Sequence, residues 1–153
     1  MSDVQGQVQG EGLVGLTEIE SAARRLAGVA VRTPLLPADA VSDAVGAEVR
    51  LKCESLQRAG AFKIRGAYNF VSQLSDEQVR EGIITYSSGN HAQAVALTGR
   101  LRGLRAVVVM PTTAPKVKVE GTRRLGGEVV FEGTVSVERK LRAEALAEEE
   151  GLV

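Results

Sequence analysis

Hydrophobic residues recur with helical spacing in several segments of the chain. The clearest example places Ile64, Ala67, Tyr68, Val71 and Leu74 on one face of a helix over residues 64–74. Capping and stop signals bound the other predicted helices, which cover residues 17–28, 75–82, 91–101, 115–125 and 136–150. We expect the first of these to begin with a capping box of Thr17 and Glu20, and the second with one of Ser75 and Gln78.

Short apolar runs between these helices predict β-strands. They cover residues 48–53, 83–86, 106–110 and 128–131, and residues 151–153 predict the opening of another strand. Before the first run, Pro34 and Pro37 predict an extended passage. Because helices separate the strands, hairpin pairing is excluded and right-handed crossovers are expected. We therefore predict an α/β fold, with a parallel sheet that helices cover on both faces.

The first sixteen residues differ from the rest of the chain. They are rich in Gly and Gln and poor in apolar side chains, which predicts a mobile arm. Residues 10–15 match the G-x-G-x-x-G pattern of dinucleotide-binding proteins. That pattern works as a turn between a strand and a helix, and no hydrophobic strand precedes Gly10. A nucleotide-binding domain built on these glycines is therefore a weak alternative.

Composition narrows the class of protein. The 153 residues are 44% hydrophobic and 25% charged, which is typical of a globular protein that folds. The 19 basic and 19 acidic residues balance, so neither nucleic acid nor an anionic membrane is an expected partner. Cys53 and His91 are the sole cysteine and histidine, which predicts no internal disulfide and no Cys/His metal site. The N-terminus lacks the features of a secretory signal, and no apolar run approaches the ~18 residues of a membrane span, so we expect a cytoplasmic protein.

One candidate site follows the predicted strand 83–86. The sequence Ser87-Ser88-Gly89-Asn90-His91 leads from that strand into a helix. Free backbone N–H groups and the positive end of the helix dipole meet there, and glycine allows close approach of a ligand. The turn therefore suits a carboxylate or a phosphate. The alternative is an ordinary helix start, capped by Ser88 or Asn90 with nothing bound.

A second candidate is the loop before the predicted helix 64–74. It delivers Phe62 and Lys63 to a helix N-terminus, where a cation is electrostatically misplaced. That field, together with desolvation, favours the neutral amine, which is a nucleophile able to form a Schiff base with an aldehyde. The alternative is a solvated surface lysine. A thiol nucleophile formed by Cys53 and His91 is a remote further possibility, because Cys53 fits better as a small core residue.

Together these two segments resemble the pyridoxal-phosphate enzymes of fold type II, and specifically the threonine dehydratase and serine racemase family. The resemblance covers nearly the whole chain after the arm. It rests on the following motifs: Arg32-Thr33-Pro34-Leu35, Glu54-Ser55-Leu56-Gln57, Gly60-Ala61-Phe62-Lys63-Ile64-Arg65-Gly66-Ala67, Ser87-Ser88-Gly89-Asn90-His91-Ala92-Gln93, Met110-Pro111 and Ala114-Pro115-Lys116.

The resemblance implies a role for each matching residue. Lys63 is expected to hold pyridoxal 5'-phosphate covalently, release it to the substrate amine and then take the α-proton. Phe62 would support the cofactor ring, and Asn90 would hydrogen-bond its ring hydroxyl. The substrate carboxylate would lie in the turn made by Ser87, Ser88, Gly89, Asn90 and His91. Ser88 also matches the serine that delivers a proton from the opposite face in racemases, and no metal ligand is expected.

The implied reaction is β-elimination. L-Threonine would give 2-oxobutanoate and ammonia, and L-serine would give pyruvate and ammonia, with the cofactor acting as electron sink. One methyl group discriminates by only ~1–3 kcal/mol, so the sequence leaves the choice between the two substrates open. A serine racemase and an inactive remnant or binding module are the alternatives. In the full-length form we expect a homo-oligomer.

The resemblance also predicts a division of the chain. Residues 1–16 are the arm, residues 17–81 match the first part of the large domain with the lysine loop, and residues 82–153 match the small domain, truncated at its last strand. The family's glycine-rich phosphate loop and the residue facing the pyridine nitrogen have no counterpart here. We therefore expect a fragment that binds the cofactor poorly and turns over little or not at all by itself. Arg65 has no role in this interpretation.

Overall fold

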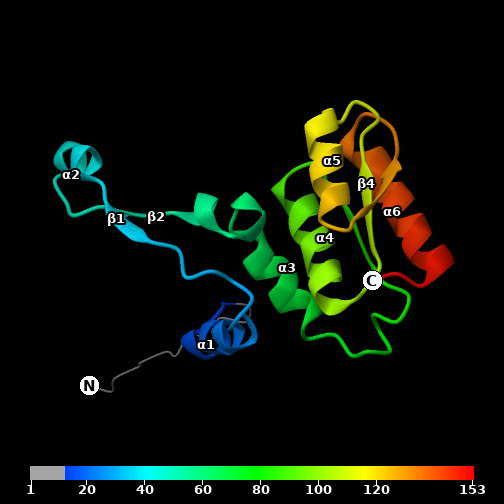
Figure 1. Cartoon of the computed structure of the whole chain (residues 1–153), viewed down its shortest axis with the longest axis horizontal. Helices are drawn as coiled ribbons and strands as arrows, with labels where there is room; N and C mark the ends of the chain where they lie inside the picture. Colours follow the sequence, from blue (N-terminus) through cyan, green and yellow to red (C-terminus); the bar gives the residue numbers. More distant parts are fainter. Residues whose placement is uncertain (1–12) are drawn as a thin grey trace, which may run out of the picture.

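A three-stranded parallel sheet organises the C-terminal half of the protein (Figure 1). The structure is a computed structural model and describes residues 13–153. The strands are β3 (Ile83–Tyr86), β4 (Ala106–Met110) and β5 (Glu128–Phe131), hydrogen-bonded in the order β3-β4-β5. Their bounds coincide with the apolar runs of the sequence, so the prediction of a parallel sheet is confirmed here.

Helices cover both faces of this sheet. Figure 1 shows α4 (Asn90–Arg102) and α5 (Lys116–Arg124) on one face and α6 (Ser136–Glu150) on the other. Successive side chains of a strand point to opposite faces, and β4 follows that rule. Val107 and Val109 pack with α6, whereas Val108 and Met110 pack with α4 and α5. All five residues of β4 are buried, which is why this strand is uniformly apolar.

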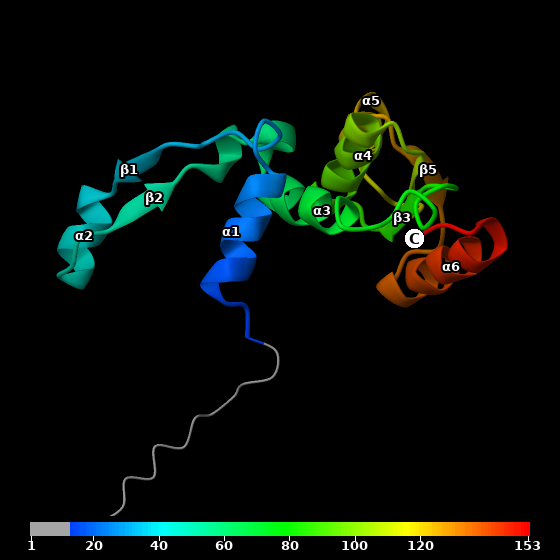
Figure 2. The same cartoon turned by 90° about the horizontal axis from the view of Figure 1, so that it is seen from below.

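Helix α3 (Lys63–Val71) links the sheet to the N-terminal half of the chain (Figure 2). It packs against α4 through buried Ile64, Ala67 and Val71, which form one hydrophobic cluster with residues of β3 and α4. The predicted apolar face is therefore correct. The helix ends at Val71, three residues before the predicted end, and Leu74 contacts the same cluster from the turn that follows.

The strand predicted at residues 48–53 does not belong to the parallel sheet. Its observed part, β2 (Arg50–Lys52), pairs antiparallel with β1 (Leu35–Pro37), in a ribbon that extends away from the sheet (Figure 1). A short helix that the sequence analysis missed, α2 (Asp39–Val45), joins the two strands. It ends at Gly46, whose φ of 68° turns the chain back toward β1. The reversal makes a two-stranded ribbon instead of a parallel crossover.

The first helix begins differently from the prediction. Helix α1 (Leu16–Arg25) starts one residue before Thr17 and ends three residues before the predicted end. The Gly15 N–H donates to Glu18 Oε2 (3.0 Å), so Glu18 takes the role expected of Glu20. The capping box of Thr17 and Glu20 is therefore wrong, because the register of the first turn is set by Gly15.

The predicted helix at residues 75–82 is also wrong. Ser75 and Gln78 do exchange the expected hydrogen bonds, at 2.9 and 3.3 Å. The segment nevertheless forms successive turns that end at Gly82, where a φ of 120° redirects the chain into β3. Its backbone bonds have mixed spacing, since the Val79 N–H donates to the Ser75 carbonyl (3.2 Å) but the Gly82 N–H donates to the Val79 carbonyl (3.0 Å), so no run of helical bonds forms.

Residues 1–12, which hold most of the predicted arm and the first half of the glycine motif, lie outside the described residues. At the other end, the Val153 N–H donates to the Gly82 carbonyl (3.2 Å) and the Ile84 N–H donates to the Val153 carbonyl (2.8 Å), the bond pattern of a parallel neighbour of β3. Between residues 13 and 153, no helix has both the length and the apolar character needed to cross a membrane.

Candidate active site

The turn after β3 is built as the sequence suggests. The Ser87 N–H donates to the Val109 carbonyl (3.1 Å) and so extends the pairing with β4, and the Gly89 N–H donates to Ser87 Oγ (3.3 Å). Gly89 is the N-cap residue of α4, and no side chain accepts a hydrogen bond from the first turn of that helix. The alternative in which Ser88 or Asn90 caps the helix is therefore wrong. The backbone N–H groups at the start of α4 therefore have no side-chain acceptor among the described residues.

Helix α4, which follows this turn, is held firmly in the core. Seven of its residues are buried, because α3, α5 and the sheet surround it. Small side chains allow that close packing: Ala92, Ala94 and Ala96 are fully buried. A Cβ added at Gly99 would lie 2.9 Å from the Leu104 carbonyl oxygen. The packing fixes the direction in which the first turn of α4 points.

The lysine loop approaches from the N-terminal half. Two short 3-10 turns, η1 (Glu54–Leu56) and η2 (Arg58–Gly60), precede α3. Ala59 and Gly60 adopt consecutive left-handed conformations, with φ of 58° and 68°, and these reverse the chain. Lys63 then begins α3, and its Nζ lies 4.9 Å from the centre of the Phe62 ring. Both side chains are exposed, so the predicted desolvation of Lys63 is absent from this structure, while its place at the helix N-terminus is confirmed.

Electrostatics places Lys63 within range of His91. His91 is exposed, yet desolvation by its neighbours lowers the pKa of its imidazole, and the positive charge of Lys63 lowers that pKa further. An apolar pocket of about 230 Å³ joins the same helices, with Gly66 and Ala67 of α3 facing His91 and Val95 of α4. The first turns of α3 and α4 therefore face each other. Lys63 and the turn, separate in sequence, are therefore carried by two helices that pack against each other.

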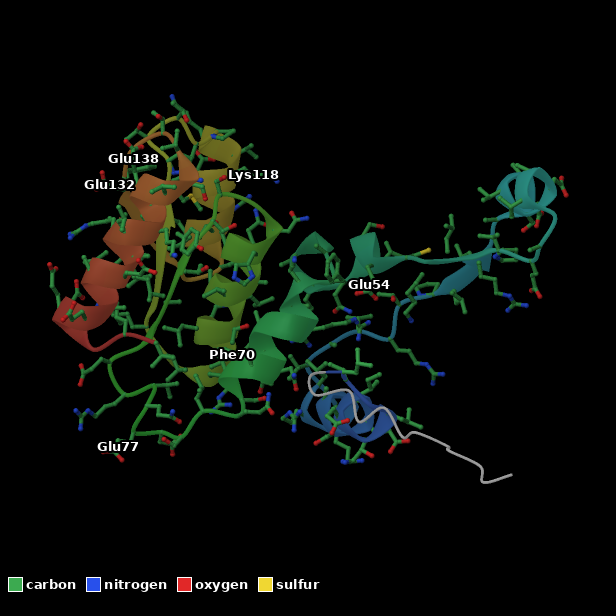
Figure 3. All side chains as sticks on the ribbon, turned by 180° about the vertical axis from the view of Figure 1, so that it is seen from behind. Glu54, Phe70, Glu77, Lys118, Glu132 and Glu138 are labelled. Carbon is green, nitrogen blue, oxygen red and sulfur yellow. The ribbon has the colours of Figure 1, made fainter. Side chains whose placement is uncertain are left out.

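A polar network behind the lysine loop went unrecognised in the sequence. Arg65 binds the Glu54 carboxylate with two nitrogens, Nε to Oε2 at 2.9 Å and a terminal nitrogen to Oε1 at 2.8 Å, and the Thr33 hydroxyl donates to Oε1 at 2.6 Å. Glu54 lies on the segment that leads from the ribbon to α3 (Figure 3). The Arg65 guanidinium lowers the pKa of the Glu54 carboxyl to about 2; desolvation opposes this effect and Thr33 adds to it.

Gln57 anchors the same loop from the other side. Its side-chain oxygen accepts from the Val31 N–H (2.8 Å) and its amide nitrogen donates to the Val31 carbonyl (2.8 Å). Arg65 also donates to that carbonyl (3.1 Å). Both Gln57 and Arg65 belong to motifs that carry the family resemblance. The pattern of apolar and polar positions could not predict the partners of these two side chains, because each hydrogen bond joins residues far apart in the chain.

The thiol alternative has no geometric support in the described part of the chain. Cys53 is half-buried at the end of β2, outside the three hydrophobic clusters, so its predicted place in the core is wrong. Its Sγ donates to the Leu51 carbonyl at 3.7 Å, within the ribbon. No contact joins it to His91 among residues 13–153.

Comparison with known proteins identifies the family. The model of the family described as "Pyridoxal-phosphate dependent enzyme" matches residues 26–153, most of the chain. The chain belongs to this family. The predictions of a fold type II enzyme and of pyridoxal phosphate as the family's cofactor are thereby confirmed.

Several relatives are similar over most of this chain. L-threo-3-hydroxyaspartate ammonia-lyase of a Pseudomonas species is 44% identical over 135 residues, which are 88% of this chain and 42% of the relative. L-threonine ammonia-lyase of Thermotoga maritima is 42% identical over 141 residues, 92% of this chain and 35% of the relative. The structure of maize serine racemase matches with a TM-score of 0.86 and 41% identity, over 92% of this chain and 43% of that one. This chain thus spans less than half the length of these relatives.

Proposed function

We propose that this chain takes part in the pyridoxal-phosphate-dependent removal of ammonia from L-threonine and L-serine, contributing the cofactor lysine and the carboxylate-binding turn. The observation that carries this proposal is that Lys63 begins α3 and the Ser87-to-His91 turn leads into α4, the helix against which α3 packs. The charge of Lys63 also acts on His91 in that turn. Two relatives named as ammonia-lyases, similar over about nine-tenths of this chain, support it.

The residues present fit the cofactor. A primary amine at the start of α3 suits an aldehyde carbon, and the exposed ring of Phe62 lies beside that amine. Gly89 leaves open space, since a Cβ placed on it would meet nothing within 4 Å. Asn90 is exposed at the first turn of α4, with an amide able to bond the ring hydroxyl. Lys63 would hold the cofactor, with Phe62 and Asn90 on its ring.

The turn would bind the carboxylate of the amino acid. Uncapped N–H groups and the positive end of α4 attract an anion, and the hydroxyls of Ser87 and Ser88 add donors. Lowering of the His91 pKa by its surroundings favours the neutral imidazole, which leaves one ring N–H to donate. These groups would fix the substrate so that its Cα hydrogen faces the Lys63 amine.

Lys63 would then act as the base. When bound, the cofactor supplies an electron sink that stabilises negative charge at Cα. Lys63, freed once the substrate amine has taken its place on the cofactor, would take the Cα proton and pass it to the β-hydroxyl, which would leave as water. Hydrolysis of the released imine would give a 2-oxo acid and ammonia.

Serine racemisation is the second candidate. Ser88 is half-buried in the turn, where its hydroxyl could return a proton to the face opposite Lys63. Relatives named as serine racemases, including that of Schizosaccharomyces pombe at 42% identity, favour this candidate. Product analysis separates the two reactions, because racemisation yields D-serine without ammonia.

Further proposals concern the whole protein. The full-length protein would bind a small amino acid as substrate, and neither nucleic acid nor a membrane. It would be cytoplasmic and form a homo-oligomer. Residues 17–81 would belong to a large domain, and residues 82–153 to a small one. The balanced charge of 19 basic and 19 acidic residues supports the choice of a small-molecule partner.

The test combines absorbance with product assays. Pyridoxal phosphate added to the chain should give an absorbance band that Lys63→Ala removes and Lys140→Ala keeps, since Lys140 lies on α6, across the sheet from α4. Release of 2-oxo acid is then measured with L-threonine and with L-serine. Equal absorbance in wild type and Lys63→Ala would refute the role of Lys63. D-serine in place of a 2-oxo acid would favour racemisation.

A further inference from the structure

Arg65 and Lys63 point away from each other at the start of α3. Successive residues of a helix are turned by 100°, so two positions separate their side chains by roughly 200° around the axis. Arg65 reaches back to Glu54 on η1, whereas the charge of Lys63 is felt by His91 on α4. Arg65 therefore ties one side of the first turn of α3 to Glu54, and the Lys63 amine projects from the other side.

The bond between Glu54 and Arg65 is strong for a pair near the surface. Two nitrogens of the guanidinium meet two oxygens of the carboxylate, and such bidentate, charge-assisted bonds add directional precision to their energy. The side chains are 19% and 33% exposed, and Thr33, the third member, is buried. This geometry fixes the rotation of α3 as well as its position.

The loop between the two partners is strained. Ala59 has a φ of 58°, in the left-handed region that non-glycine residues rarely adopt. Strained backbone persists where its surroundings over-determine it, and it gathers at functional sites. Here the Glu54/Arg65 pair joins the two ends of the loop, and the bonds of Gln57 to Val31 hold it from within, two residues before Ala59.

We propose that the Glu54/Arg65 pair is a positioning element that holds the Lys63 amine toward the turn after β3. It touches neither substrate nor cofactor, and its effect on catalysis rests on the proposed function. A neighbouring pair serves as a control: Arg50 on β2 bonds Glu48 at 2.6 Å, but both side chains are more than half exposed and the bond ties residues only two positions apart. Loss of that pair should leave Lys63 in place.

His91 reports the position of Lys63 without any cofactor. It is the sole histidine in the sequence, so its ring signals in an NMR titration are unambiguous. Lys63→Gln should raise the pKa of His91, because a nearby positive charge is removed. Glu54→Gln tests the proposal by the direction in which it shifts the His91 pKa. Removal of a negative charge alone would lower the His91 pKa, whereas displacement of Lys63 would raise it.

The expected result is a raised His91 pKa in both Glu54→Gln and Arg65→Lys, and no change in Arg50→Gln. Arg65→Lys keeps the charge but loses the two-pronged bond, and it serves as the second variant if Glu54→Gln does not fold. An unchanged or lowered His91 pKa in the folded variants would overturn the proposal. So would a Lys63→Gln variant that leaves His91 unaffected.

Binding of pyridoxal phosphate provides the link to function. Followed by absorbance, its affinity should fall roughly tenfold in Glu54→Gln, the factor typical for loss of a charge-assisted bond, and stay unchanged in Arg50→Gln. Equal affinity in Glu54→Gln and wild type would also overturn the positioning role. Failure of the proposed function gives a different result, since Lys63→Ala would then leave the absorbance of the wild-type mixture unaltered.

Discussion

The Glu54/Arg65 pair should make the stability of the fold depend on pH in a defined range. Glu54→Gln keeps the size of the side chain and removes its charge, which leaves the Arg65 guanidinium without its carboxylate partner. The pKa of Glu54 falls from 4.5 to about 2 in the fold. That shift corresponds to an upper bound of about 3 kcal/mol. Because the two side chains are 19% and 33% exposed, solvent screening reduces the expected contribution to about 1–2 kcal/mol.

The sign follows from the lowered pKa. A carboxylate whose pKa is lower in the folded state stabilises the fold fully above its unfolded pKa, and this contribution is lost as the pH falls toward the folded value. The wild type should therefore exceed Glu54→Gln in unfolding free energy by about 1–2 kcal/mol near neutral pH. The difference should shrink between about pH 4.5 and about pH 2, the two pKa values of Glu54.

Urea denaturation at a series of pH values measures this difference. Arg50→Gln is the control, because its pair with Glu48 is more exposed and should contribute little at any pH. A difference between wild type and Glu54→Gln that stays constant over the whole range would refute the reasoning. The same would hold if Arg50→Gln reproduced the pH dependence.

Four further substitutions test the packing and the surface charges, each read from thermal or urea unfolding. Gly99→Ala should destabilise by about 1–3 kcal/mol, because its Cβ would lie 2.9 Å from the rigid Leu104 carbonyl, whereas Gly121→Ala meets only the flexible end of a glutamine and should cost nothing; equal losses would contradict this. Ile64→Ala, at a fully buried site, should cost about 2–5 kcal/mol, and a loss below 1 would mean that α3 packs loosely. Arg105→Gln breaks the ion pairs of Arg105, 42% exposed, with Glu128 and Glu150, and should lower the unfolding free energy by less than about 1 kcal/mol. Added salt should abolish this loss by screening, and a loss that does not depend on salt would be inconsistent with surface pairing.

The sequence predicted those elements whose local pattern and tertiary environment agree. Strand β4 is an unbroken apolar run because both of its faces are covered, and its bounds were predicted correctly. The turn from Ser87 to His91 was located for the same reason, since a strand, a glycine and a helix start follow each other directly. Local chemistry is sufficient in these places.

Elements that depend on distant partners escaped prediction. β2 has the pattern of a strand, but the pattern does not tell which strand it pairs with. Its partner β1 follows Pro34 and ends at Pro37, and these prolines suggest only extended chain. The Glu54/Arg65 pair joins positions eleven residues apart across two 3-10 turns, with no continuous helix or strand between them whose pattern could relate the two positions. The exposure of Lys63 was missed because burial depends on what surrounds the helix start.

The central claim is that Lys63 is the amine that binds pyridoxal phosphate, and site-resolved trapping tests it most directly. The chain is mixed with pyridoxal phosphate, reduced with borohydride to fix the cofactor wherever it is bonded, digested and mapped by mass spectrometry. Lys63 should carry most of the label, well above exposed Lys140 and Lys116. Label spread evenly over the exposed lysines would contradict the account.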